Sequence, residues 1–239
     1  MKKANFVGII KLKKSIQEES VITYEAIKEN EAIKEYITAA DHSLKALGFT
    51  EHSFAHVGKV ADCAAYILTS LGYDAHTVEL SKIAGHLHDI GNLVNRTDHS
   101  QSGAIMAFRI LDKLGMPAED IATVVTAIGN HDEGTGVPVN EVAAALILAD
   151  KSDVRRSRVR NSDASTFDIH DRVNYSVESS ELIIDNDNKI IRLELKIDTA
   201  ISSLMSYFEI FLERMLLCRR AAEKLGLAFK LTINEQHFI

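Results

Sequence analysis

An adjacent histidine and aspartate, His88 and Asp89, end a segment of small and apolar residues and are followed by Gly91. Imidazole and carboxylate groups are ligands for borderline and hard divalent metals. At the end of a helix, the two side chains can approach one ion from two directions. Because a His-Asp pair occurs by chance in many proteins, a metal site here depends on partners elsewhere in the chain.

Further imidazoles and carboxylates recur in order along the chain, each within or at the end of a predicted helix. They are His56, His99, His131, Asp132 and Asp150. Several stand where a helix would otherwise present an apolar or small-residue face. Together with His88 and Asp89, they are the residues that we predict to bind metal.

Helical periodicity extends from about residue 30 to residue 160, with apolar residues at spacings of three and four. Capping residues and glycines mark where most of these helices begin and end. A short helix over Ser15–Lys28 comes first. The longer predicted helices run from Asn30 to Gly48, from Thr50 or Ser53 to Leu71, from Asp74 to Gly91, from Ser100 to Leu114, from Pro117 to about His131, and from Asn140 or Pro138 into the basic run Lys151–Arg160.

The pattern changes after residue 160. A polar loop, Asn161–Asp171, precedes two alternating segments, Val173–Ile184 and Lys189–Ile197, which predict a β-hairpin. A long amphipathic helix over Thr199–Leu225 and a third alternating segment, Ala228–Ile233, follow. We therefore predict a mainly α protein with two parts. Residues 1–160 form a helical bundle with its core at about 30–160, and residues 161–239 form a small α+β unit of antiparallel strands and one long helix packed on it.

The composition and net charge of the chain argue against several classes of protein, among them general nucleic-acid-binding proteins, disulfide-bonded proteins and membrane-spanning proteins. The chain has 239 residues, a formal net charge of −7 and two cysteines, Cys63 and Cys218. The negative charge disfavours general nucleic-acid binding, and the cysteines are expected as buried thiols without a disulfide. No apolar run approaches the roughly 18 residues of a membrane span, and no signal-peptide cleavage site follows the N-terminal lysines. We therefore expect a cytoplasmic protein without a membrane partner.

The order of the candidate ligands resembles the HD superfamily of metal-dependent phosphohydrolases. That family has a histidine, then a His-Asp doublet, then a late aspartate, each on its own helix of a bundle. The matching positions are His56, His88-Asp89 and Asp150, over about residues 50–155. The resemblance implies an HD-type helical bundle in which these four residues hold one ion and His88 and Asp89 form the catalytic centre. His52 lies four residues before His56 on the same helix face and is an alternative ligand, although the flanking residues favour His56.

A subset of the superfamily, which includes the HD-GYP group, holds two metals through extra histidines. His99 and His131 resemble those positions, so the resemblance implies that Asp89 bridges to a second ion held by His99, His131 and Asp132. The mixed donor set suits Fe, Mn, Zn, Ni or Co better than Mg. Two such cations lower the pKa of a shared hydroxide and neutralise charge on a phosphoryl group.

Three positions depart from the family pattern. Asn92 stands where the motif often has lysine, Asp132 where the HD-GYP loop has a second histidine, and Val137 where tyrosine is expected. We therefore do not expect cleavage of cyclic di-GMP. A substrate phosphate would instead be bound by other cations, for which the candidates are Arg96, Lys151, Arg155 and Arg156. The alternative for the basic run is a solvated helix C-terminus.

These residues favour an enzyme that cleaves a phosphate ester of a nucleotide or related small phosphorylated compound by a metal-activated hydroxide. Asn92 in place of lysine motivates a second hypothesis, in which the domain binds metal or nucleotide and regulates without turnover. The C-terminal unit is either a homodimerisation or substrate-lid module, or it packs on the helical domain within one chain.

Overall fold

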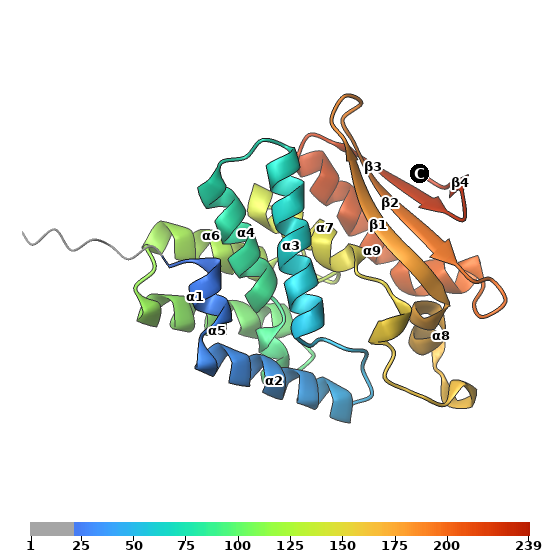
Figure 1. Cartoon of the computed structure of the whole chain (residues 1–239), viewed down its shortest axis with the longest axis horizontal. Helices are drawn as coiled ribbons and strands as arrows, with labels where there is room; N and C mark the ends of the chain where they lie inside the picture. The colour runs from blue at the N-terminus through green and yellow to red at the C-terminus, as the bar shows by residue number, and fades with distance from the viewer. Residues whose placement is uncertain (1–21) are drawn as a thin grey trace, which may run out of the picture.

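The computed structural model describes residues 22–239, which form a helical bundle beside a small sheet (Figure 1). The bundle begins with a short helix, and residues 15–21 of the predicted Ser15–Lys28 helix lie outside the described residues. Its helices are α1 (Tyr24–Lys28), α2 (Glu31–Ala46), α3 (Phe54–Ser70), α4 (Ala75–Leu87), α5 (His99–Leu114), α6 (Ala118–Gly129) and α7 (Glu141–Ser152).

The predicted capping residues begin four of these helices. Asn30, Ser53, Asp74 and Asn140 each accept a hydrogen bond from a backbone N–H of the first helical turn. Each side chain satisfies a donor that the helix itself leaves unpaired. Ser53, and not Thr50, is therefore the cap of α3.

Helix α7 lies at the centre of the molecule. Its residues from Val142 to Ala149 are all buried, and the helix packs against α3, α4, α6 and the C-terminal helix α9 (Leu204–Lys224). A helix that is apolar on all sides is stable only when other elements surround it. The α+β unit therefore packs on the bundle and covers the side of α7 that the bundle leaves open (Figure 1).

The C-terminal unit is a four-stranded sheet with the order β1-β2-β3-β4. The strands are β1 (Val177–Asp185), β2 (Ile190–Ile197), β3 (Ala228–Ile233) and β4 (Gln236–His237). The predicted hairpin is confirmed as the antiparallel pair β1 and β2. The prediction of antiparallel strands throughout is wrong, because β3 pairs with β2 in parallel. Parallel neighbours need a long crossover, and α9 provides it.

Three predicted boundaries differ from the structure. The third helix ends at Leu87, and a 3₁₀ turn, Ile90–Leu93, carries the chain past Gly91. The basic run after Asp150 leaves α7 at Ser152 and forms a second 3₁₀ turn, Arg156–Arg158. Helix α8 (Ile169–Ser176) replaces the end of the predicted polar loop and the start of the predicted strand, because Asp168 caps it. A further 3₁₀ turn, Ala164–Thr166, lies inside the loop.

Two composition-based expectations concern the cysteines and the membrane. Cys63 and Cys218 are free thiols; Cys218 is buried as predicted, whereas Cys63 is only half-buried. None of the helices within residues 22–239 combines the length and the apolar character needed to cross a bilayer. Homodimerisation stays a prediction, and Met205, Leu212 and Leu216 form exposed apolar positions on α9.

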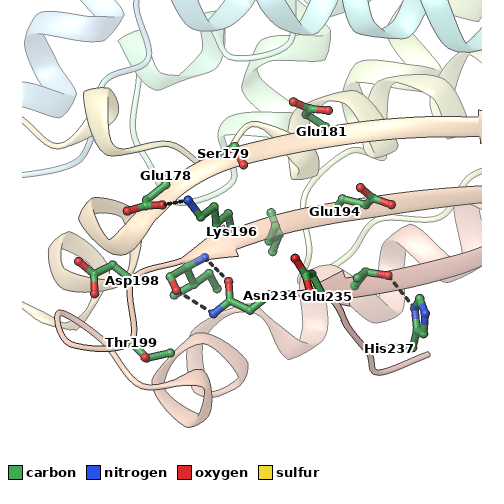
Figure 2. Close-up of a pocket in the computed structure, with 13 residues that line it drawn as sticks. Glu178, Ser179, Glu181, Glu194, Lys196, Asp198, Thr199, Asn234, Glu235 and His237 are labelled. Atoms are coloured by element: carbon green, nitrogen blue, oxygen red, sulfur yellow. Dashed lines mark hydrogen bonds and ion pairs between the residues drawn. The ribbon is translucent and has the colours of Figure 1, made fainter.

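The solvent-facing side of the sheet is polar (Figure 2). Lys196 pairs with Glu178 at 2.8 Å, and the side-chain amide of Asn234 bonds both the backbone N–H and the C=O of Ile197, each at 2.8 Å. Asn234 and Glu235 have φ values of 50° and 67° and form the turn between β3 and β4. Asn234 thus ties this turn to the end of β2.

We expect Asn234→Ala to lower the free energy of unfolding by about 1–3 kcal/mol, because it leaves two backbone groups of β2 without partners. Alanine is also strained at positive φ, whereas glycine is not. Asn234→Gly is therefore the matched control, and we expect its loss to be smaller. Urea unfolding measures both. Equal stability of all three proteins would contradict this role of the amide.

Candidate metal centre

Five elements bring the predicted ligands to one place. His56 comes from the first turn of α3, His88 and Asp89 follow the end of α4, and His99 is the first residue of α5. His131 follows α6, and Asp150 lies near the end of α7. All except Asp150 are buried, and Asp150 is half-buried.

The first group of ligand atoms comprises His56, His88 and Asp150. One atom from each residue lies within 4.8 Å of the others. Oδ1 of Asp150 is 3.3 Å from Nε2 of His56 and 3.6 Å from Nε2 of His88. Oδ2 of Asp89 faces the same two nitrogens at 3.5 and 3.2 Å. We name these four side chains the first cluster.

The second group shares His88 and Asp89 with the first cluster and adds His131. His99 also belongs here, since its Nε2 lies 3.5 Å from Oδ1 of Asp89 and 3.1 Å from Nε2 of His131. We name His99, His131 and Asp89 the second cluster. The two carboxylate oxygens of Asp89 therefore face different clusters, which is the arrangement expected of a bridging ligand.

The hydrogen bonds of the four histidines fix which ring nitrogen carries the proton. The Nδ1 atoms of His88, His99 and His131 lie 2.8, 3.1 and 2.6 Å from backbone carbonyl oxygens, and Nδ1 of His56 lies 2.8 Å from Oδ2 of Asp153. Only an N–H can bond these acceptors, so in the neutral form of each ring the Nε2 atom carries the lone pair and faces the cluster.

The surroundings of the histidine Nε2 atoms indicate whether a cation fits between them. The Nε2 atoms of His56 and His88 are buried and have no hydrogen-bond partner within residues 22–239. The Nε2 atoms of His99 and His131, 3.1 Å apart, bring two lone pairs together, which is repulsive in the absence of a shared cation or proton. Buried polar atoms require a partner, so the donor set fits divalent metal.

The charges in the clusters also fit a cation. Burial lowers the pKa of His88, but Asp89 and Asp150 outweigh it and raise the pKa to about 10. Burial raises the pKa of the two carboxyls, but His88 beside Asp89 and Lys151 beside Asp150 hold both well below their usual range. Burial lowers the pKa of His99 and of His131, so their imidazoles are neutral. Anionic carboxylates and neutral imidazoles are the forms that bind metal, and an ion at the first cluster would take the place of the second proton of His88.

Asp153 is a functional residue that the sequence reasoning missed. It is almost fully buried, and besides His56 it contacts Lys59 at 2.9 Å and Arg155 at 3.0 Å. Burial raises the pKa of its carboxyl, but His56 and Arg158 outweigh it and hold the pKa below the usual range. A carboxylate behind a ligating histidine orients the ring and raises its basicity. The one signal in the sequence is a second aspartate three residues after Asp150.

Comparison with known proteins agrees with this geometry. Residues 53–166, which contain both clusters, match the HD domain family. The chain contains an HD domain. The HD superfamily is one of metal-dependent hydrolases, and its domains bind divalent metals.

Two proteins are similar to this HD protein. An uncharacterized protein of Methanocaldococcus jannaschii is 25% identical over 205 residues, covering 76% of this chain and 78% of its own length. The crystal structure of a predicted HD superfamily hydrolase from an uncultured Thermotogales bacterium is 22% identical, covers 55% of this chain and 73% of that chain, and has a TM-score of 0.40. These likenesses do not define a substrate for this chain.

The HD site opens into a cleft of about 830 Å³, and Asp89, His99 and Asp150 form part of its lining. Of the predicted phosphate-binding residues, Arg96 and Lys151 also line it. A separate hollow of about 870 Å³ on the sheet contains none of the predicted ligands (Figure 2).

Two predicted phosphate-binding residues do not line the cleft. Arg155 bonds Glu51 at 2.9 Å, and Arg156 bonds the carbonyl of Tyr175 at 2.6 Å and stacks on its ring. Both lie in the segment after α7, where these contacts hold their guanidinium groups outside the cleft lining. Two arginines that the sequence reasoning did not single out, Arg158 and Arg214, line it instead.

Two further candidates lie near the clusters without joining them. The side chain of Asp132 belongs to neither group of ligand atoms, and its backbone oxygen accepts the N–H of Gly136 at 2.7 Å. His52 lines the cleft, but its Nδ1 bonds the carbonyl of Thr50 at 2.7 Å and its ring packs edge-on against His56. The structure therefore groups His56, and not His52, with the HD doublet.

Gly91 sets the distance between the doublet and α5. A Cβ atom at this position would overlap the backbone oxygen of His99 and the backbone nitrogen of Gly103. We expect Gly91→Ala to cost about 1–3 kcal/mol of stability by overpacking and to reduce the metal content, because it pushes His99 away from Asp89.

Gly58→Ala is the matched control for this glycine. It lies in α3 with open space around its Cβ position within residues 22–239, so we expect a gain of about 0.5–1 kcal/mol from helix propensity. Thermal unfolding and elemental analysis check both variants. A Gly91→Ala protein with full metal content would show that this close approach is unimportant.

We expect Asp153→Asn to weaken metal binding about 10–100-fold, because the neutral amide no longer stabilises the Nδ1–H of His56. The measurement is a titration of metal-free protein with Mn²⁺ or Zn²⁺. Asp62→Asn, an exposed position on the same helix as His56, is the control and should leave the affinity unchanged. Unchanged affinity in Asp153→Asn would exclude this orienting role.

Proposed function

We propose that this HD protein is a metal-dependent phosphohydrolase that cleaves a phosphate ester of a nucleotide or related small phosphorylated compound. The observation that carries the proposal is the pair of clusters that share Asp89, next to a cleft that Asp89, His99 and Asp150 help to line. When bound there, divalent cations would activate water for attack on phosphorus and neutralise the phosphoryl charge.

Arg96 supplies the cationic charge that Asn92 cannot. Asn92 donates to Oδ1 of Asp89 at 3.0 Å, and its own oxygen accepts from Arg96 at 3.3 Å. This chain of contacts holds the guanidinium close to the bridging carboxylate and facing the cleft. A guanidinium binds phosphate oxygens through two parallel hydrogen bonds, which suits the recognition of a phosphoryl group.

Lys151 contacts the predicted metal ligand Asp150 and is therefore less available to a substrate phosphate. Its Nζ lies 2.7 Å from Oδ2 of Asp150 and 3.3 Å from Oε2 of Glu133. Burial lowers the pKa of Lys151, but the two carboxylates outweigh it, so the amine stays cationic. Lys151 thereby occupies one oxygen of Asp150 and leaves Oδ1 facing His56 and His88.

A second function is favoured by Asn92 itself. Because the motif lysine is absent, the domain could bind metal and nucleotide as a regulatory unit without turnover. Both functions require the same ligands. They differ only in whether product forms.

We expect purified protein supplied with Mn²⁺ or Fe²⁺ to hydrolyse members of a panel of phosphomonoesters, nucleotides and cyclic dinucleotides. Asp89→Asn should lose metal and lower kcat by at least about a hundredfold, the scale seen when an electrostatic group is removed from a reacting centre. Asp112→Asn, exposed on α5, is the control.

The outcomes separate the two functions. Product formation that depends on Asp89 supports the hydrolase. Tight nucleotide binding without product supports the regulatory domain. Absence of divalent metal after loading would contradict both.

A further inference from the structure

The cleft above the metal site has two walls of different origin. One wall comes from the connection between α2 and α3 and includes Phe49. The other comes from the C-terminal unit, where α9 contributes Phe208, Glu209, Leu212 and Glu213. The C-terminal unit therefore forms part of the active-site cleft, and its side chains face whatever part of the substrate extends beyond the reacting phosphate.

The cations of the cleft are concentrated at its floor, and most are already neutralised. Arg214 pairs with Glu133 at 2.8 Å, and the same carboxylate pairs with Lys151. Arg158 lies 3.8 Å from Asp153 and donates to two backbone carbonyls. Of the lysines and arginines that line the cleft, Arg96 alone has no carboxylate partner among residues 22–239. The floor thus offers one free cation beside the metal clusters.

The rim of the cleft carries the opposite charge. Asp168 and Asp171 near the start of α8, together with Glu209 and Glu213 on α9, line the cleft. None of these four carboxylates pairs with a lysine or arginine in the described part of the chain, and the one ionisable partner is His170, 3.9 Å from Asp168. A phosphate held at this rim would meet uncompensated negative charge.

Between floor and rim, the cleft exposes apolar surface. Phe49 is 41% exposed and Leu212 is 50% exposed, and both line the cleft. The guanidinium of Arg96 lies over the Phe49 ring, 5.7 Å from its centroid. A flat, weakly polar group next to the phosphate would cover this surface, and aromatic side chains bind nucleobases through stacking.

We propose, building on the hydrolase function above, that the substrate is a nucleoside monophosphate. Its one phosphate lies at the metal clusters and Arg96, its base lies against Phe49 and Leu212, and the carboxylates of α8 and α9 reject nucleotides with additional phosphates. The C-terminal unit is therefore the element that determines substrate specificity.

The test compares adenosine monophosphate with adenosine triphosphate in the presence of excess Mn²⁺. In the unchanged protein, kcat/KM and affinity favour the monophosphate. In the double variant Glu209→Gln/Glu213→Gln, we expect kcat/KM for the triphosphate, divided by kcat/KM for the monophosphate, to rise about tenfold at low ionic strength. The rise is smaller at high salt, because salt screens the removed charges. Calorimetric association constants give the same ratio without requiring turnover.

Two further variants serve as controls. Glu181→Gln/Glu223→Gln removes two exposed carboxylates outside the cleft, changes the net charge equally and leaves the ratio unchanged. Leu212→Ser lowers the affinity for both nucleotides by the same factor, about threefold to tenfold, because it removes apolar contact to the base and not to the phosphates.

Each outcome decides one of the two proposals. If neither nucleotide is hydrolysed but the ratio of association constants rises as stated, the hydrolase function fails and the specificity assignment stands. If the monophosphate is hydrolysed but the triphosphate-to-monophosphate ratio of kcat/KM is the same in Glu209→Gln/Glu213→Gln as in the unchanged protein, only the specificity assignment fails. A protein that prefers the triphosphate, or binds neither nucleotide, also overturns it.

Discussion

The burial of several ionisable groups at one point of an apolar bundle is the constraint on which the rest of the structure depends. Unpaired, such groups would destabilise the fold by several kcal/mol each, on the order expected for polar atoms removed from water. The protein bonds every Nδ1 of the four cluster histidines to a fixed acceptor and leaves the Nε2 atoms for a cation. The fold and the metal site therefore impose the same requirement on these residues.

Close approach of the backbone makes this arrangement possible. Gly85 in α4 packs so closely on α3 that a Cβ atom would overlap the backbone of Ala61, and Gly91 packs as closely on α5. Since the ligands come from the ends of different helices, any loosening of these contacts would separate the two clusters. The glycine of the HD motif is thus explained by packing and requires no direct part in the chemistry.

The C-terminal unit is linked to the metal site by charge as well as by packing. Arg214 on α9 contacts Glu133, Glu133 contacts Lys151, and Lys151 contacts the ligand Asp150. This path joins the loop after α6, the central helix α7 and the crossover helix α9. It makes the position of α9 matter to the candidate metal ligand Asp150, even though α9 contributes no residue to either cluster.

The sequence by itself determined the features that depend on neighbouring residues. Helix starts at Asn30 and Asp74 follow from local hydrogen bonds, those at Ser53 and Asn140 were each one of two candidates, and the hairpin follows from alternation around a turn. The order of histidines and aspartates was enough to indicate the HD superfamily, because it resembles the motif of that family.

Only the tertiary structure decided what depends on residues far apart in the chain. The parallel pairing of β2 and β3 requires α9 to cross the sheet, and strand alternation carries no information on direction. In the irregular segment after α7, Arg158 reaches the cleft whereas Arg155 and Arg156 bond Glu51 and Tyr175 elsewhere. The 3₁₀ turn Arg156–Arg158 is too short for a repeating apolar pattern to reveal its faces, so packing alone settles which charge reaches the cleft.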